Sequence, residues 1–533
     1  MDPTLILRHV RLRRSIARLA AALAVALVVG AVLPVTRGAA PALAARQDAR
    51  IVISGARTFD PAAAGDSGSA EVDAQLFETL TAFDSGLTLR PALASSWQVL
   101  DGGTQVVFTL RDGLRFSDGS SLAAADVVRS WLRVIDPAHP SPLASLLDEV
   151  QGARQYRTGA VNADAVGIRA TDARTVEVRL SRPQSDFPAI VSGPTFGVVP
   201  PNVTSWDDPT HIAVSGGYRA TVVTAGEITL AANDGYWAGR PAIATLHLLT
   251  DLGGVSPVDA FTAGNVDYTP IGSLDAGWIS YDKTLGPQLR SIASMTVSYF
   301  GFDTHRAPFS DVRVRQAFAA AVDWRRLAAL ASVGDRTPAT GMVPPGVLGR
   351  SDRDFLPAHD PEAAKADLAA AGYPDGKGFP AVTLLTDGSG YEAAIVADLR
   401  SALGIDVAVE TMDPDTYFTR LETDPPAFWS LSWVADYPGA NDFLGLLLGT
   451  GATANYGGWS SSEFDAAIGD ALASTDESSA VAAYDRAQAV VQREVPVVPV
   501  DYSQAWALSN PKLLGAGENG LSIMRMAGLA WGS

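Results

Sequence analysis

The hydrophobic pattern separates the first 45 residues of this 533-residue chain from the rest. Arginines between positions 8 and 18 precede an almost uninterrupted apolar run, 19–33, and small residues that include Ala42-Leu43-Ala44 follow it. A charged start, an apolar centre and a small-residue cleavage site are the parts of a signal peptide. The run is shorter than the roughly 20 residues that cross a bilayer. We therefore predict that 1–45 is a cleavable signal peptide, and an uncleaved membrane anchor is the alternative.

The same stretch contains Arg13-Arg14-Ser15-Ile16, which resembles a twin-arginine export signal. An ordinary charged start in an arginine-rich chain is the alternative. Both routes lead out of the cytoplasm, so we expect an exported protein that is periplasmic or otherwise extracytoplasmic.

Beyond residue 45, short alternating apolar runs and amphipathic helical patterns follow one another without a repeat or a low-complexity linker. Alternation over a short run that turn residues bound predicts a strand. The predicted strands are 49–53, 106–111, 175–180, 228–232 and 244–250, and the predicted helices of this half are 70–80 and 122–134. The lack of linkers predicts domains that are interwoven rather than arranged in series.

The second half of the chain carries clearer helix signals. Ser310 is the predicted cap of a helix that reaches about residue 330. Asp360-Pro361 provides a capping side chain and a first-turn proline for the next helix. Asp476 precedes an amphipathic pattern that ends near 493, so it is the predicted cap of a third helix.

A β-α-β unit and a proline-containing segment complete the pattern. Strand 382–386, helix 391–403 and strand 406–410 follow in order, and the strands of such a unit are parallel. Residues 495–500 are rich in valine but include Pro496 and Pro499. Because proline has no backbone N–H, we predict that this segment is an edge strand or an extended crossover.

Composition and charge exclude several classes of function. The length predicts two to four domains. The net charge of −18 becomes −23 when 1–45 is removed, so no nucleic-acid partner is expected. The chain has no cysteine, which excludes disulfides, thiolate metal sites, a cysteine nucleophile and a thioether lipid anchor. Its six histidines are spread without metal-ligand spacing, so we expect no metal and no other cofactor.

Several blocks of the body resemble a known family. Residues 89–128 include LRPALASSW and VVFTLRDGLRFSDGSSLAAADVV, which closely resemble the signature of the family 5 extracellular solute-binding proteins of ABC importers for peptides and nickel. Further blocks follow in family order: APFSDVRVRQAFAAAVD (307–323), DPEAAKADLAAAGYPDGKGFP (360–380) and WVADYP (433–438). The run SPLAS at 141–145 is most similar to the oligopeptide-binding branch.

The resemblance implies an α/β fold of the periplasmic-binding-protein type (class II, cluster C), with two lobes, a hinge and an extra domain. The expected boundaries are 46–78, 209–295 and 501–533 for a discontinuous domain I, 79–208 for domain II and 296–500 for domain III. Domains I and III are the expected ligand-binding lobes. The hinge is expected in two strands near 294–299 and 500–503.

The resemblance also implies how a peptide is held. Peptides bind such proteins as an added strand, so the main chain supplies affinity and hydrated pockets tolerate varied side chains. The expected strand-pairing segments are Gly65-Asp66-Ser67 on one lobe and Ser432-Trp433-Val434 on the other. Asp436 falls at the carboxylate that pairs with the peptide α-ammonium, which needs such a partner when buried. A turn aspartate is the alternative for Asp436, and a core side chain is the alternative for Trp433.

Three further expected ligand contacts depart from the family pattern. Peptide binders of fixed length often place cations where the α-carboxylate lands, but here Tyr391 occupies one such place and Arg420 is the only nearby cation. Leu143 stands where the oligopeptide branch usually has a tyrosine. The length and even the class of the peptide therefore stay open, since nickel chelates, haem, sugars and opines bind to the same scaffold.

We expect a non-enzymatic, monomeric receptor that captures a small peptide or another amine-bearing solute and delivers it to a membrane ABC permease. A binding-only sensor or chaperone on the same fold is the alternative. A secreted peptide hydrolase is a third hypothesis, and the sequence offers it neither a nucleophile–base pair nor a metal cluster.

Overall fold

The computed structural model describes residues 46–533 except Pro140, Ser185, Thr204, 332–335, Ser389 and Thr475. The predicted signal peptide, 1–45, therefore lies outside the described residues. Within the described part of the chain, no helix is both long enough and apolar enough to cross a bilayer. Gln47–Ser533 form one compact unit.

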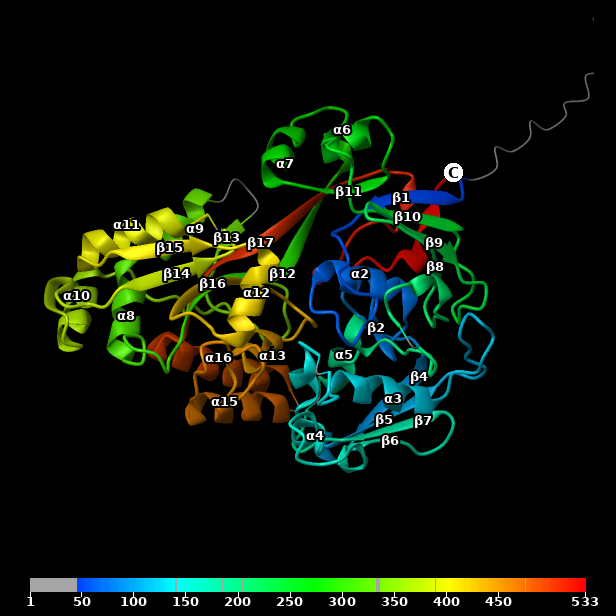
Figure 1. The fold of residues 1–533 in the computed structure, drawn as a ribbon, viewed down its shortest axis with the longest axis horizontal. Coiled ribbons are helices and arrows are strands. Elements are labelled where there is room, and N and C mark those ends of the chain that lie inside the picture. Colours follow the sequence, from blue (N-terminus) through cyan, green and yellow to red (C-terminus); the bar gives the residue numbers. More distant parts are fainter. Residues whose placement is uncertain are drawn as a thin grey trace, which may run out of the picture. The chain divides into compact units, whose positions relative to one another are not determined.

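Eleven strands of this unit form one mixed sheet (Figure 1). Its order is β15 (Val407–Thr411), β14 (Val382–Thr386), β16 (Phe428–Val434), β12 (Leu289–Phe302), β17 (Val497–Ser509), β11 (Tyr268–Ile271), β1 (Asp48–Val52), β10 (Thr245–Leu249), β9 (Glu227–Ala232) and β8 (Tyr218–Val223), with β13 (Arg336–Pro338) paired to β17 off this path. Strands from distant parts of the sequence are neighbours, so the chain is interwoven as predicted.

The two longest strands, β12 and β17, pair antiparallel in the middle of the sheet (Figure 1). Their ladder is interrupted, because β12 has two more residues between Ala293 and Val297 than β17 has between Tyr502 and Gln504. Such bulges bend a strand and leave residues unpaired. Here Met295 donates its N–H to the carbonyl oxygen of Gly520 at 2.7 Å instead. The interruption lies within the strands that were expected to form the hinge.

Residues 497–500, within the segment predicted as an edge strand or crossover, begin β17 and pair with β12 on one side only, as an edge strand does, although β17 then continues into the centre of the sheet. Pro499 lies opposite Tyr299, next to a second register shift between β12 and β17. The missing N–H therefore falls where the ladder is already irregular. On the other side of β17, pairing begins only after the prolines, with β13 at 501–503 and β11 at 506–509.

The predicted β-α-β unit is confirmed by β14, α11 (Glu392–Leu403) and β15, since the two strands pair in parallel. The helices α10 (Pro361–Ala370) and α16 (Glu477–Glu494) also begin where their caps predicted. The Asp360 carboxylate accepts the N–H of Glu362 and Ala363, and the Asp476 carboxylate accepts that of Ser479 at 2.9 Å.

The helix predicted over 310–330 is two helices, α8 (Val312–Ala321) and α9 (Trp324–Ala331). Asp311, not Ser310, caps the first, and its carboxylate accepts the N–H of Arg313 at 2.9 Å. Val322 is extended, and the Asp323 carboxylate then accepts the N–H of Arg326 at 3.0 Å. The break follows from this second capping aspartate, which the helical periodicity alone concealed.

A separate antiparallel sheet, β4-β5-β7-β6, lies within 79–208, the segment expected as domain II. Its strands are β4 (Ala94–Leu100), β5 (Gln105–Leu110), β7 (Thr175–Arg179) and β6 (Ile168–Ala170), and α3 (Ala124–Val134) contacts β6 and β7. The buried rings of Phe108, Trp131 and Phe187 pack edge-to-face or tilted in its core.

Shorter elements connect these sheets. They are α2 (Ser67–Leu76), β2 (Thr81–Phe83), β3 (Leu89–Pro91), α4 (Ala153–Arg157), α5 (Phe187–Ile190), α6 (Pro257–Thr262), α7 (Ser273–Ile279), α12 (Pro414–Thr423), α13 (Ala440–Phe443), α14 (Gly445–Leu448), α15 (Ser462–Ala473), β18 (Leu513–Leu514) and β19 (Ala530–Trp531). Two of them, α2 and α13, position the residues of the candidate site.

Candidate functional site

Asp436 follows the end of β16, and hydrogen bonds from backbone N–H groups hold this segment in place. Its N–H donates to Oδ2 of Asp442 at 3.1 Å, and the preceding residue, Ala435, donates to the carbonyl oxygen of Met295 at 2.9 Å. The carboxylate is half-buried. One of its oxygens, Oδ2, is inaccessible to solvent and accepts a hydrogen bond from no described residue. A buried carboxylate oxygen without a donor lowers the stability of the fold. A ligand that donates a hydrogen bond to Oδ2 would therefore be favoured.

Asp442 on α13 fixes the geometry around Asp436. Its side chain is fully buried, and Oδ2 accepts both the Asp436 N–H and the indole Nε1–H of Trp433, the latter at 2.9 Å. The Trp433 side chain and the Asp436 backbone, from two residues that were expected to contact the ligand, thus hydrogen-bond to one buried carboxyl. The sequence prediction missed Asp442, which stands in an apolar stretch like a core residue.

Burial changes the protonation of both carboxyls. It raises the pKa of Asp436 to about 7. It also raises the pKa of Asp442 well above its usual range, and the nearby charge of Asp436 raises it further. Burial thus favours the neutral form of Asp442 and brings the titration of Asp436 near neutral pH. A cation placed beside Asp436 would favour its ionised form.

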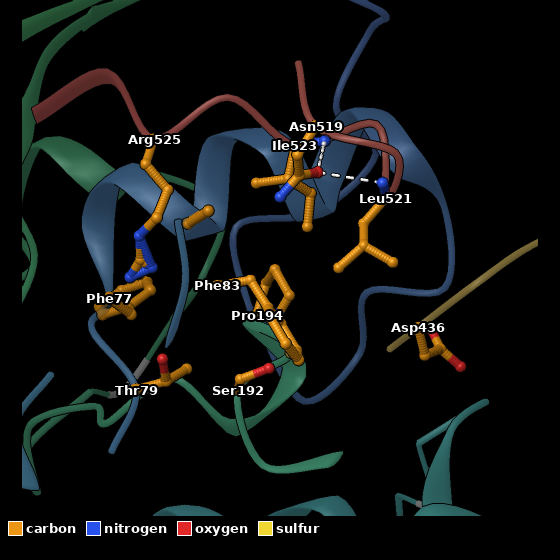
Figure 2. Close-up of a pocket in the computed structure, with 12 residues that line it drawn as sticks. Phe77, Thr79, Phe83, Ser192, Pro194, Asp436, Asn519, Leu521, Ile523 and Arg525 are labelled. Carbon is orange, nitrogen blue, oxygen red and sulfur yellow. Dashed lines mark hydrogen bonds between the residues drawn. The ribbon is translucent and has the colours of Figure 1, made fainter. Parts of the chain in front are cut away.

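Asp436 lines a pocket with mostly apolar walls (Figure 2). The apolar side chains are those of Phe77, Phe83, Pro194, Leu521 and Ile523. The side-chain oxygen of Asn519 accepts the backbone N–H of Leu521 and Ile523 and so shapes the loop that carries them. The cavity has a volume of about 30 Å³, far below the roughly 300 Å³ of ordinary ligand pockets. In this structure the pocket has room for only a few water molecules.

Arg525 lies at the end of the pocket opposite Asp436 (Figure 2). Its guanidinium pairs with the carboxylate of Glu78, and its side chain is 31% exposed. Glu78 also accepts the hydroxyl of Tyr236 at 2.5 Å. Burial alone would raise the pKa of Glu78, but the Arg525 charge and these hydrogen bonds bring it below its usual value. The pocket therefore has an acidic end, apolar walls and a compensated cationic end.

The edge of β16 next to this pocket is open. Throughout its length β16 pairs with β12, but it pairs with β14 only at Phe428 and Trp429. Within the part of the chain that the structure describes, no strand pairs with the other edge of 430–434. Ser432 and Val434 are exposed there. Unpaired N–H and C=O groups of such an edge can pair with an added strand.

The other expected strand-pairing segment lies at the start of α2. The Asp66 carboxylate caps this helix by accepting the N–H of Ser69 at 2.9 Å, and Ser67 is its first residue. A Cβ atom on Gly65 would lie 3.0 Å from Pro142, so this segment is next to the one that carries Leu143. Leu143 itself is half-buried against the core. None of Gly65, Asp66, Ser67 and Leu143 lines the pocket at Asp436.

Tyr391 and Arg420 lie away from that pocket as well. Tyr391 is buried, and its hydroxyl donates to Asp501 at 2.5 Å. Arg420 forms an ion pair with Asp424 one turn along the same helix. Their expected ligand contacts stay predictions. In the described parts of 46–533, no group of three acidic or histidine side chains is arranged to hold a metal ion.

Comparisons with known proteins agree with this fold. Residues 88–455 match the sequence pattern of the bacterial extracellular solute-binding proteins, family 5. The chain is 31% identical over 475 residues to the probable deoxycholate-binding periplasmic protein YgiS of Escherichia coli, with 86% of this chain and 88% of the relative covered. It is 25% identical to the oligopeptide-binding protein OppA of Bacillus subtilis, with 84% and 86% covered.

A solved structure shows the same architecture. The OppA structure of Burkholderia pseudomallei superposes with a TM-score of 0.82 at 25% sequence identity, and the match covers 92% of this chain and all of that one, 100%. Such agreement over the whole described body confirms the expected periplasmic-binding-protein fold. The chain belongs to the bacterial extracellular solute-binding proteins of family 5.

Proposed function

We propose that this protein captures a peptide by its free α-ammonium at Asp436 and delivers it to an ABC importer. The observation that carries the proposal is the buried Oδ2 of Asp436, which has no donor among the described residues and belongs to a residue that lines the pocket. An ammonium supplies the missing donor and the compensating charge. The open edge at Ser432-Trp433-Val434 supports main-chain pairing with the same peptide.

The proposed arrangement has the expected three domains, with domain I at 46–78, 209–295 and 501–533, domain II at 79–208 and domain III at 296–500. The interrupted β12–β17 ladder is the proposed hinge. Because the pocket of about 30 Å³ is too small for a residue of a peptide, the lobes open to admit the ligand and close on it. Gly65-Asp66-Ser67 and Leu143 approach the peptide from the other lobe, and Tyr391 and Arg420 contact its distal part.

We propose an exported, monomeric protein without enzymatic activity that acts at the periplasmic face of its permease. Relatives named for peptide binding support the peptide as cargo, among them the B. subtilis oligopeptide-binding protein. Export by a cleaved signal peptide at 1–45 is part of the same proposal.

A second candidate ligand is an amphipathic anion with a rigid apolar body. The relative at 31% identity is named for probable deoxycholate binding. The apolar walls and the partly exposed guanidinium of Arg525 favour this alternative, since the carboxylate of a bile salt would lie at Arg525 and a hydroxyl at Asp436.

The deciding experiment is calorimetric titration of a free peptide, the same peptide N-acetylated, and deoxycholate. We expect Asp436→Asn to weaken binding of the free peptide by at least about 100-fold, because a buried ammonium loses its charged partner. The acetylated peptide binds weakly to both proteins. Asp406→Asn, at an exposed carboxylate, is the matched control.

Two outcomes would overturn the peptide proposal. Equal losses for the free and the acetylated peptide would remove the role of Asp436 as amine anchor. Tight binding of deoxycholate, lost in Arg525→Gln and kept in Asp436→Asn, would establish the amphipathic anion instead.

A further inference from the structure

The backbone of β16 faces β12 at every second residue. Ala435 donates its N–H to the carbonyl oxygen of Met295 at 2.9 Å, and Asp303 donates its N–H to that of Ala427 at 3.1 Å. Both bonds have the register of the ladder between the two strands. Successive residues of a strand direct their N–H and C=O groups to opposite sides, so the odd-numbered positions of β16 face β12. The even-numbered positions face the other edge.

Two of these even-numbered positions are already occupied. Phe428 lies where β14 pairs with β16. The carbonyl oxygen of Ser430 accepts the hydroxyl of Tyr417, which comes from α12. Tyr417 is fully buried and Ser430 is 2% exposed, and the Ser430 hydroxyl donates to Oγ1 of Thr386 at 3.0 Å. An added strand therefore cannot pair with the carbonyl group of Ser430.

The edge that stays open has only two residues facing it. Ser432 and Val434 are exposed, and no described residue hydrogen-bonds to the backbone groups that they direct to this edge. Beyond Val434 the chain turns at Asp436, whose N–H donates to Asp442 at 3.1 Å. The open edge therefore runs from the proposed amine anchor to Ser432 and ends there.

We propose that this short edge makes the protein a receptor for tripeptides, with Tyr417 as the residue that sets the length. The limit rests on the proposed function, since it takes the α-ammonium of the peptide to lie at Asp436. Asp436 follows the carboxyl end of β16, so a peptide that starts there and follows the edge runs antiparallel to the strand.

The antiparallel register then assigns a partner to each peptide residue. In such a pair, directly opposed residues that exchange two hydrogen bonds alternate with residues that do not. The first peptide residue lies opposite Val434 and the third lies opposite Ser432. The second and fourth residues direct their backbone groups away from β16. A fifth residue would lie opposite Ser430, where Tyr417 occupies the acceptor, so the third residue is the last that gains main-chain bonds.

Calorimetry with alanine peptides of two to five residues tests this length. We expect trialanine to bind at least about tenfold more tightly than dialanine, because the third residue adds two hydrogen bonds at Ser432. Tetraalanine and pentaalanine should bind within about threefold of trialanine. The C-terminal amides of the same peptides are the control for the charge of the carboxylate, and they should give the same order.

Methylated backbone nitrogens test the register without a change in the protein. N-methylation of the third residue of trialanine removes the donor to the Ser432 carbonyl oxygen and should weaken binding at least about tenfold. N-methylation of the second residue, whose N–H points away from β16, is the matched control and should weaken binding less than about threefold. In pentaalanine, N-methylation of the fifth residue should also leave the affinity within about threefold.

A substitution on α12 tests the role of Tyr417. Tyr417→Ala removes both the hydroxyl at Ser430 and the ring, so pentaalanine should then bind at least about fivefold more tightly than trialanine. Leu421→Ala, one turn further along α12 and also buried, is the matched control and should keep the two affinities equal. Circular dichroism verifies that each variant is folded, and the methylated peptides decide if Tyr417→Ala is not.

Three outcomes would overturn the length limit. An affinity that rises at least about tenfold from trialanine to pentaalanine in the parent protein would do so and leave the amine anchor in place. Equal losses on methylation of the second and the third residue would also do so. If no alanine peptide bound at all, the proposed function would fall together with the limit, so the two failures are distinguishable.

Discussion

Asp436 and Asp442 are neighbouring carboxyls with different surroundings, and this difference predicts a pH dependence of capture. In the proposed capture an ammonium pairs with ionised Asp436, and burial raises the pKa of this carboxyl to about 7. Below that pH, binding has to displace a proton, so affinity falls. We expect affinity for a peptide to drop about 50-fold from pH 7 to pH 5, while the peptide amine stays charged.

Titration calorimetry at several pH values measures this dependence. Asp436→Asn is the control, because it removes the titrating group and should flatten the profile. A peptide affinity that is constant between pH 5 and pH 7 in the parent protein would contradict the prediction.

Asp442 has a positioning role that two substitutions separate from its charge. Burial raises its pKa well above the usual range and so favours its neutral form, and Asp442→Asn keeps a neutral acceptor for the Trp433 indole and the Asp436 N–H. We expect this variant to bind peptide within about twofold of the parent. Asp442→Leu leaves both donors unpaired and should bind at least about tenfold more weakly.

Calorimetry at pH 7 compares the two variants, and circular dichroism verifies that each is folded. If Asp442→Asn bound as weakly as Asp442→Leu, the ionised charge of Asp442 rather than its hydrogen bonds would matter.

The sequence singles out individual residues only where a family block surrounds them. Asp436 was singled out because it stands in WVADYP, and its contact with a ligand stays a prediction. Asp442 was missed because its role depends on a turn that folds it back under Trp433. The first helix was predicted over 70–80, yet α2 begins at Ser67 with Asp66 as its cap, since a cap and a polar loop share the same residue types.

At the scale of elements, the split between α8 and α9 predicts a local effect of the second cap. Asp323→Ala removes the acceptor for the Arg326 N–H and should destabilise the first turn of α9 by about 1 kcal/mol. Backbone amides of this turn should then exchange about fivefold faster with deuterium. Asp323→Asn, which keeps a capping oxygen, is the control, and equal acceleration in both variants would show that the cap is not the cause.

Local signals predicted the elements that depend on local contacts. Caps at Asp360 and Asp476 and the β-α-β unit were found because their determinants lie within a few residues. The continuation of 497–500 into a central strand was not found, because its partners on β12 and β11 lie about two hundred residues or more earlier in the chain. The proline rule holds for 497–500 alone, where only one edge is paired.

At the scale of the whole described unit, the contact between Ser145 and Thr453 offers a place for an engineered disulfide that would restrict opening when oxidised. Their hydroxyl oxygens are 2.6 Å apart, and the chain has no cysteine of its own. We expect Ser145→Cys with Thr453→Cys to form one disulfide on oxidation. If the segments that carry Ser145 and Thr453 separate when the protein opens, the disulfide should hinder opening. The oxidised variant should then take up peptide at least about tenfold more slowly.

Stopped-flow fluorescence with a labelled peptide measures the uptake, and a reducing agent should restore it. Ser145→Cys alone is the control. Equal uptake rates in the oxidised and reduced double variant would show that the segments carrying Ser145 and Thr453 stay in contact during capture.

The position of β17 in the sheet determines when the sheet can form during synthesis. This strand lies between β12 and β11, yet it comes from residues 497–509, after every other strand of the sheet. During synthesis, the earlier strands are made while their central neighbour is missing, and this pairing is highly non-local. The sheet is therefore completed only after almost all of the chain has been synthesised.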